Sequence, residues 1–250
     1  MAQANAQAKT LETTVEAWLL KRVLRILSTV DASITILPRE DGVRFESLSA
    51  DKTALVAVDV DWFRGLGGGL LFDVYDASRL LRALPWSRLD VKVAIDGNLL
   101  RAATMDGDFN AKLDVIEKLE DVMDGVLRNL SNGVKAVMSV DAFKLWSWFK
   151  PFSIAGESRA HFEFRNDGFT ISTLNEDAVL RLDVSSALLD YDVNAEFRVS
   201  YYLGYATSFL DEVKRNGSVN VTIAQGKPML IEAMLERGIV ARIAQAPMVD

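Results

Sequence analysis

Apolar residues recur along the chain at two different spacings, and each spacing predicts one kind of element. Between residues 10 and 30 they fall every three or four positions, as on one buried face of a helix. A second helix is expected over residues 75–84, because Pro85 ends it. Alternating or uninterrupted apolar runs predict strands at residues 33–37, 43–48, 54–60, 90–95, 99–103 and 109–116.

The second half of the chain repeats this order of elements. Residues 41–51 align without gaps on residues 167–177, an offset of 126, and residues 91–95 align on residues 219–223, an offset of 128. Self-similarity of this kind indicates a duplicated unit, so we predict two tandem copies of one helix-and-strand domain, residues 10–116 and 134–250. The second copy is expected to have helices at residues 140–149 and 202–215, and strands at residues 160–165, 169–174, 178–184, 219–224, 228–235 and 239–243.

Two segments lie outside the predicted copies. Residues 1–9 lack the continuous apolar run of a signal peptide and are expected to be a disordered lead-in. Residues 117–133 form a charged interdomain connector, expected either as a loop on the sheet surface or as a short amphipathic helix. The simpler interpretation is that its apolar residues only hold a linker against the surface; they are Leu119, Val122, Met123, Val126 and Leu127.

Composition narrows the possible functions. Half of the residues are apolar and a quarter are charged, which is typical of a globular chain with a substantial core. No apolar run approaches the roughly 18 residues that span a bilayer, and we expect a cytoplasmic protein. The chain has no cysteine and a single histidine, His161, which excludes disulfides, thiolate zinc sites and multi-histidine metal sites.

The glycine-rich segment of residues 65–69 invites comparison with a phosphate-binding loop. Such a loop needs a helix directly after it, whereas the apolar run of residues 70–74 is more typical of a strand. We therefore expect a turn between strands. His161 lies in a predicted strand and is expected to be a surface or packing residue, because no nucleophile can be paired with it.

Acidic residues offer a weak case for a metal. Asp59 and Asp61 lie two apart in a predicted strand, so they would share a face, but no third ligand is evident and a solvated strand face is expected. A run of acidic residues in the connector is likewise expected to be a solvated face: Glu117, Glu120, Asp121 and Asp124. We predict no catalytic residue, no metal site and no cofactor.

Basic residues give a stronger signal. The formal net charge is −7, yet the two helices expected in the first copy concentrate cations. Ordinary solvated helix faces would account for either helix taken singly, but a segregated basic face also suits sequence-independent, salt-sensitive contact with phosphates. Few aromatic residues interleave with these cations in the sequence, so stacking on single strands is not expected. The cations concerned are Lys21, Arg22, Arg25, Arg79 and Arg82.

The sequence resembles the sliding clamps of the proliferating cell nuclear antigen (PCNA) type, an archaeal member in particular. The resemblance covers essentially everything after residue 9. It is carried by short motifs in the family's order: Leu20-Lys-Arg-Val-Leu, Phe45-Glu-Ser-Leu-Ser-Ala-Asp, Asp76-Ala-Ser-Arg-Leu-Leu-Arg, Gly226-Lys-Pro-Met-Leu-Ile-Glu and Ala246-Pro-Met-Val.

The resemblance implies an α+β fold in which helices cover one face of antiparallel sheets and three chains close into a ring. Duplex DNA would pass through the ring, which is a processivity factor for replication and repair without catalytic activity. Implied partners are DNA polymerase, the clamp loader, flap endonuclease and DNA ligase, bound through short peptides, together with identical or paralogous clamp subunits. The implied location is the nucleoid of a prokaryote. Three chains at −7 give −21, which would repel DNA from the outside of the ring.

The resemblance also assigns residues to three surfaces. The DNA-facing positions would be Lys21, Arg22, Arg25, Arg79, Arg82, Lys144, Lys150, Lys214 and Arg215. The pocket for partner peptides would comprise Leu48, Val122, Met123, Val126, Pro228, Ala246 and Pro247. The subunit interface would pair residues 109–116 with residues 179–184 of a neighbour, through Phe109, Leu113, Val115, Val179, Leu180 and Leu182.

Several features depart from the family pattern. Ala244 stands where family tails carry an aromatic residue, the connector is a few residues longer, and the second copy looks less basic than the first. Two other function classes therefore stay open. One is a protein-binding scaffold that keeps the clamp fold without encircling DNA, and the other is an enzyme that uses the acidic residues and a metal.

Overall fold

The computed structural model describes residues 10–30, 33–104, 107–116, 121–133, 135–154, 159–173, 179–183 and 190–248. The predicted disordered lead-in at residues 1–9 lies outside the described residues. No helix in the described ranges is both long and apolar enough to cross a membrane.

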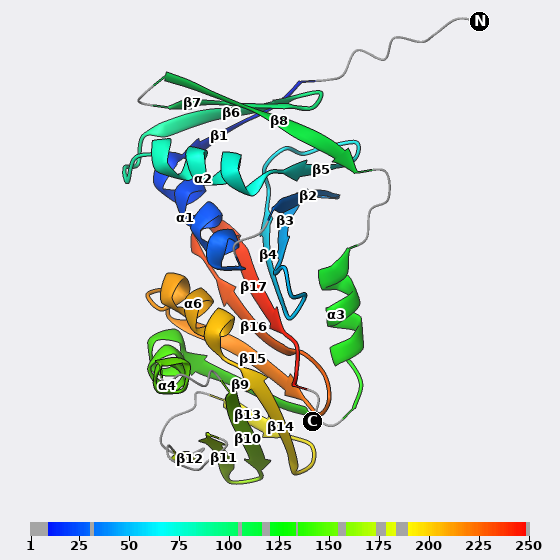
Figure 1. Cartoon of the computed structure of the whole chain (residues 1–250), viewed down its shortest axis with the longest axis vertical. Helices are drawn as coiled ribbons and strands as arrows, with labels where there is room; N and C mark the ends of the chain where they lie inside the picture. Colours follow the sequence, from blue (N-terminus) through cyan, green and yellow to red (C-terminus); the bar gives the residue numbers. More distant parts are fainter. Residues whose placement is uncertain are drawn as a thin grey trace, which may run out of the picture.

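The first half of the chain is an alternation of strands and two helices (Figure 1). Its elements are β1 (Leu11–Glu16), α1 (Ala17–Leu27), η1 (Ser28–Val30), β2 (Ile34–Arg39), β3 (Gly42–Leu48), β4 (Ala54–Val60), β5 (Gly69–Phe72), α2 (Val74–Ala83), β6 (Asp90–Asp96), β7 (Leu99–Thr104) and β8 (Gly107–Ile116). The helix α3 (Val122–Leu130) then leads into the second half.

The second half follows the same plan with one additional strand. Its elements are β9 (Lys135–Asp141), α4 (Ala142–Ile154), β10 (Arg159–Arg165), β11 (Gly168–Ser172), β12 (Val179–Asp183), β13 (Asp190–Val193), β14 (Phe197–Tyr202), α6 (Gly204–Val213), β15 (Ser218–Ala224), β16 (Met229–Met234), η2 (Glu236–Gly238) and β17 (Val240–Gln245).

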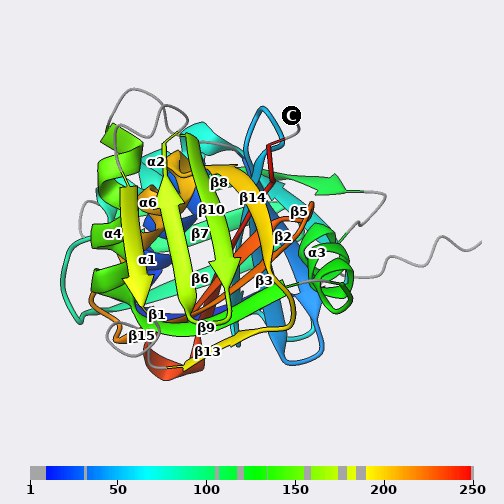
Figure 2. The same cartoon turned by 90° about the horizontal axis from the view of Figure 1, so that it is seen from below.

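Strand pairing repeats between the halves. β1 pairs with β6 as β9 pairs with β15, and the antiparallel run β2-β3-β4 has its counterpart in β10-β11-β12. β4 pairs with β17 and so joins strands of both halves into one 13-stranded sheet, while β10, β11, β12 and β14 form a separate four-stranded sheet. The four-stranded sheet lies at the lower end of the molecule in Figure 1 and faces the viewer in Figure 2, which is seen from below. The predicted α+β fold with a duplicated plan is confirmed.

Among the described residues, α1, α2, α4 and α6 lie on one side of the sheets and α3 lies on the other (Figure 1). α1 contacts both α2 and α6, and α6 contacts α4, so the four form a row. Because helices lie on both sides of the sheets, β4 has a covered face on each side. Val56 and Val58 join the main core, whereas Leu55 and Ala57 pack in the cluster under α3. Both faces of this strand are covered, which is why its sequence is almost uninterruptedly apolar.

Some predicted boundaries are wrong. Residues 11–16 form β1 and not the start of a helix, because Leu11 and Val15 are buried against β6 while the β-branched Thr13 and Thr14 suit a strand. The expected helix at residues 140–149 begins at Ala142, after β9. β13 and β14 were not predicted. The glycine-rich segment does lead into a strand, β5, and no helix starts directly after it.

Candidate functional site

The helical face, formed by α1, α2, α4 and α6, carries the predicted DNA-facing cations. Those of α1 tie this helix to its neighbours. Lys21 Nζ donates to the Leu84 carbonyl oxygen at 2.6 Å, and Arg25 pairs with Glu212 at 2.6 Å. Arg22 donates to the Glu212 carbonyl oxygen at 3.2 Å and to the Asn216 side chain, and burial lowers its pKa. These three cations are therefore held in place by the protein itself.

The remaining predicted cations lie on the same side of the sheets. Arg79 of α2 pairs with Asp76 at 2.9 Å, and Arg82 of α2 is exposed. Lys144 and Lys150 are exposed on α4, while Lys214 and Arg215 follow the end of α6. The nine predicted cations thus lie on, or directly after, helices on one side of the sheets, although the residues come from both halves of the chain.

Aromatic rings stand among these cations, contrary to the sequence-based expectation. The Trp86 indole is 58 % exposed, with Lys21 Nζ 5.1 Å and the Arg25 guanidinium 5.3 Å from its ring centroid. In the second half, Lys150 and Lys214 lie 4.3 Å and 4.1 Å from the Trp146 ring. The contact of Trp86 with Lys21 and Arg25 could not be predicted from local sequence, because at least 61 residues separate the ring from these cations. The four-residue spacing from Trp146 to Lys150 was a usable signal, because residues four apart are neighbours on a helix.

Two adjoining cavities open between these helices. The first, of about 800 Å³, lies between α1, Trp86 and the end of α6; the second, of about 670 Å³, lies between α1, α4 and α6. Both are lined by Arg25, Asp211 and Glu212, so they meet at the Arg25–Glu212 ion pair. We call the two cavities together the indole groove, because Trp86 lines one and Trp146 lines the other.

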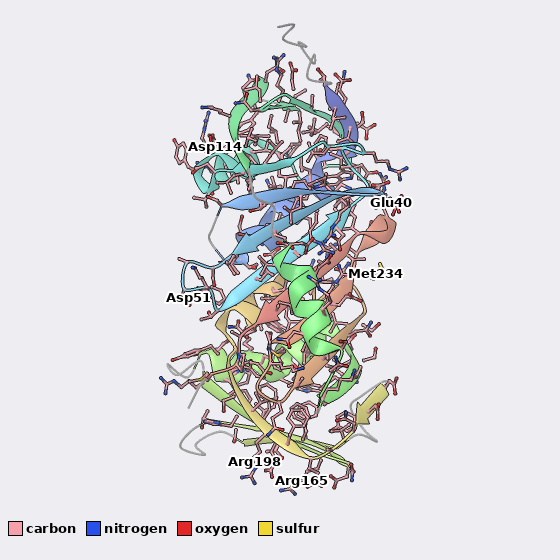
Figure 3. All side chains as sticks on the ribbon, turned by 90° about the vertical axis from the view of Figure 1, so that its right-hand side faces the viewer. Glu40, Asp51, Asp114, Arg165, Arg198 and Met234 are labelled. Atoms are coloured by element: carbon pink, nitrogen blue, oxygen red, sulfur yellow. The ribbon has the colours of Figure 1, made fainter. Side chains whose placement is uncertain are left out.

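The connector folds as the amphipathic helix, one of the two forms expected for it. α3 lies across the sheet face opposite the helical face (Figure 3). Met123 and Leu130 are buried there against Leu55, Leu230 and Ala244. Met123 was predicted to line a peptide pocket, which is wrong for its side chain: it anchors α3 and is closed to solvent.

The other predicted pocket residues are accessible. Leu48 and Val122 are exposed, and four more are half-buried: Val126, Pro228, Ala246 and Pro247. The Ala246 N–H donates to the Thr53 carbonyl oxygen at 2.7 Å, which places the C-terminal tail beside the turn between β3 and β4.

An ion-pair network fastens α3 to the sheet. The buried Arg44 guanidinium reaches Asp59 at 2.5 Å, Asp121 at 2.9 Å and Asp124 at 2.7 Å. Arg39 also pairs with Asp124, and its hydrogen bonds, with those of Arg44, lower the Asp124 pKa to about 2. We expected Asp59, Asp121 and Asp124 to be simple solvated side chains. That expectation is wrong, because all three carboxylates form ion pairs with Arg44.

No group of acidic or histidine residues in the described ranges could hold a metal ion. Asp61 lies beyond the end of β4 and pairs only weakly with Arg64 at 3.7 Å, so it does not share a strand face with Asp59 as expected. His161 is half-buried in β10, with Nδ1 2.6 Å from the Ser200 hydroxyl oxygen, which agrees with a packing role.

The two strands predicted to join subunits lie at opposite ends of the long axis (Figure 1). β12 is an edge strand of the four-stranded sheet, and its Val179, Leu180 and Leu182 are described only by their backbone. In β8, residues 107–112 pair with β7 and residues 113–116 pair with β5. Phe109 and Leu113 are buried in the core and so cannot offer side chains to a neighbour as predicted, whereas Val115 is 68 % exposed.

No protein-family model matches the chain, and no curated protein matches it. Solved structures do. The PCNA of A. fulgidus, determined with the C-terminal region of FEN-1 bound, superposes with a TM-score of 0.75 at 15 % identity, over 96 % of this chain and 99 % of that one. The PCNA of Thermococcus kodakaraensis gives a TM-score of 0.74 at 16 % identity, over 96 % and 100 %.

A third similar structure is a PCNA2–PCNA3 complex from Sulfolobus tokodaii, with a TM-score of 0.73 at 13 % identity, over 97 % of this chain and 100 % of that one. The likeness extends over nearly the whole of each chain, although only 13–16 % of the residues are identical. This chain therefore has the fold of the PCNA sliding clamps.

Proposed function

We propose that this protein is a DNA sliding clamp, which encircles duplex DNA as a ring of three subunits and tethers enzymes of replication and repair. The observation that carries the proposal is the joint occurrence of the clamp fold and nine cations on its helical face, in a chain with a formal net charge of −7. A basic inner face and an acidic exterior direct DNA to the inside of a ring.

Ring closure is supported by the internal repeat. Within the chain, β4 pairs with β17 and joins the halves, which we propose to be domains of residues 10–116 and 134–250 linked by residues 117–133. By the order of pairing, the counterparts of β4 and β17 are β12 and β8, which lie at the two ends of the molecule. Backbone pairing of β8 with β12 of the next chain would repeat the internal junction and cover exposed strand edges.

Partner enzymes are proposed to dock on the face that carries α3. Exposed apolar residues Leu48 and Val122 and the half-buried tail residues Ala246 and Pro247 are available there to short peptide anchors. The A. fulgidus structure holds the C-terminal region of FEN-1, and the S. tokodaii structure is a complex of PCNA2 with PCNA3. We therefore propose flap endonuclease, DNA polymerase, DNA ligase and the clamp loader as partners, and identical or paralogous clamp chains as neighbours.

On this proposal the protein has no catalytic activity of its own and works on the nucleoid of a prokaryotic, archaeal-type cell. The alternative is a scaffold that binds proteins without encircling DNA. Retention on DNA separates the two: a clamp stays on closed circular duplex after loading and slides off when the circle is cut, whereas a scaffold is insensitive to the cut.

Molar mass by light scattering after size-exclusion chromatography is the first test of ring closure. One chain has a mass of 27.7 kDa, so a self-closing ring of three should appear near 83 kDa. A chain that stays at 27.7 kDa at every concentration would contradict a homotrimer, and mixing with paralogous subunits should then restore the larger species.

A further inference from the structure

The indole groove has a feature that electrostatic contact with a duplex does not need: aromatic rings stand among its cations. An indole ring lines each of its two cavities, and two cations lie over each ring: Lys21 and Arg25 over Trp86, and Lys150 and Lys214 over Trp146. At the Trp146 end, the exposed Phe143 ring lies 5.5 Å from the indole and enlarges the aromatic surface. We propose that the indole groove binds single-stranded DNA, whose bases stack on Trp86 and Trp146 while its phosphates lie against the flanking cations.

The charge of the groove suits a nucleic acid strand. Its lining contains five cations, Arg22, Arg25, Lys150, Lys214 and Arg215, against three carboxylates, Asp211, Glu212 and Glu236, although the whole chain carries −7. Two of the carboxylates are engaged, since Glu212 pairs with Arg25 and Asp211 with Lys214. The same ion pairs engage Arg25 and Lys214, so the groove keeps a net charge of +2, from Arg22, Lys150 and Arg215 against Glu236.

The exposure of Trp86 favours a single strand over a duplex. In a duplex the faces of the bases are stacked on one another, so an indole outside the helix meets only sugars, phosphates and groove edges. Trp86 remains 58 % exposed even with Lys21 and Arg25 over its ring, which leaves part of the ring surface open to an incoming base. Stacking of one base on an aromatic side chain typically strengthens binding by about tenfold or more.

The inference rests on the proposed function, because it concerns the face that is proposed to surround duplex DNA. On that proposal, a loaded ring would hold an unpaired stretch at the groove more tightly than the duplex on either side. The clamp would then pause where a duplex gives way to a single strand, since elsewhere its contacts with phosphates are exchangeable.

Fluorescence anisotropy of the full-length protein with labelled oligo(dT) of about 20 nucleotides, and with a duplex of the same length, tests the inference. Trp86→Ala should weaken oligo(dT) binding about tenfold and change duplex binding by less than twofold. Met234→Ala is the matched control: Met234 lines the same cavity and is also 58 % exposed, but it has no ring, so both affinities should stay unchanged (Figure 3). Trp146→Leu, which keeps an apolar side chain in the core contact, should weaken oligo(dT) binding in the same way as Trp86→Ala.

An oligonucleotide with abasic sites separates stacking from charge. It keeps every phosphate but has no bases, so the wild-type protein should bind it as weakly as Trp86→Ala binds oligo(dT). Equal binding of abasic and normal strands, or an equal loss of duplex and oligo(dT) binding in Trp86→Ala, would overturn the inference. If the protein is retained on closed circular duplex but Trp86→Ala does not change oligo(dT) binding, the sliding-clamp proposal stands and single-strand binding in the indole groove is refuted. Oligo(dT) binding that depends on Trp86, without any retention on circular duplex, would support single-strand binding in the indole groove and contradict the sliding clamp.

Discussion

At the scale of the residue, Glu46 is a buried carboxyl whose charge state should differ between the folded and the unfolded chain. The residue is 4 % exposed, and its carboxylate lies 3.9 Å from Arg44 and accepts a hydrogen bond from the Met123 N–H at 3.2 Å. Burial, with the neighbouring charge of Asp121, raises the Glu46 pKa to about 7. The folded chain therefore keeps a proton at Glu46 over a range of pH in which the unfolded chain has lost it.

This difference predicts that stability falls as the pH rises. The stabilisation is complete below the unfolded pKa of about 4.5 and is lost as the pH passes through about 7. Between pH 5 and pH 8 the free energy of unfolding should drop by on the order of 2 kcal/mol from this group. Glu46→Gln keeps the hydrogen-bond acceptor for the Met123 N–H. In this variant the free energy of unfolding, measured with urea, should no longer show this decrease with pH. Glu40→Gln, at an exposed carboxyl in the turn after β2, should keep it (Figure 3); the same slope in both variants would contradict the assignment.

At the scale of the element, α3 depends on a single buried anchor near its start. Met123 is closed to solvent in the cluster with Leu55 and Leu230. Met123→Ala should lower the free energy of unfolding by about 2–4 kcal/mol and speed amide exchange over residues 122–130. Val122→Ala, at the exposed neighbouring position, should change either quantity little. Unchanged exchange in Met123→Ala would mean that the ion pairs of Arg44 hold α3 without the apolar contact.

The elements also show what a sequence can and cannot predict. Most strands, four helices and the amphipathic character of the connector follow from local periodicity. β1 was hidden because the apolar positions Leu11 and Val15 fit a helical spacing as well as an alternating one, and only its pairing with β6 separates the two. The network of Arg44 was hidden for a different reason. Its partners Asp59 and Asp121 are 15 and 77 residues away, and no local pattern records that the fold brings them together.

At the scale of the whole molecule, the placement of charge should matter more than its amount. Replacing Arg79 and Arg82 of α2 by Glu changes the formal charge of the helical face by −4 in each chain. Replacing Arg165 and Arg198 by Glu makes the same change on the four-stranded sheet, at the far end of the molecule (Figure 3). We expect the first pair to weaken retention on circular duplex at least tenfold, with a shallower dependence on salt, because fewer counterions are released on binding. The second pair should leave retention within about twofold, because long-range repulsion between solvated charges is screened at physiological salt.

Peptide binding completes this comparison, because the proposed docking face lies on the other side of the sheets from α2. Both double variants should bind a partner-derived peptide as the wild type does. If Arg79→Glu with Arg82→Glu lost peptide binding as well, the helical face would not be a separate DNA surface. If it kept DNA retention, Arg79 and Arg82 would be ordinary solvated side chains and the ring would hold DNA without them. An acidic chain can hold DNA only if its cations are collected where the DNA passes, and this pair of variants tests that requirement directly.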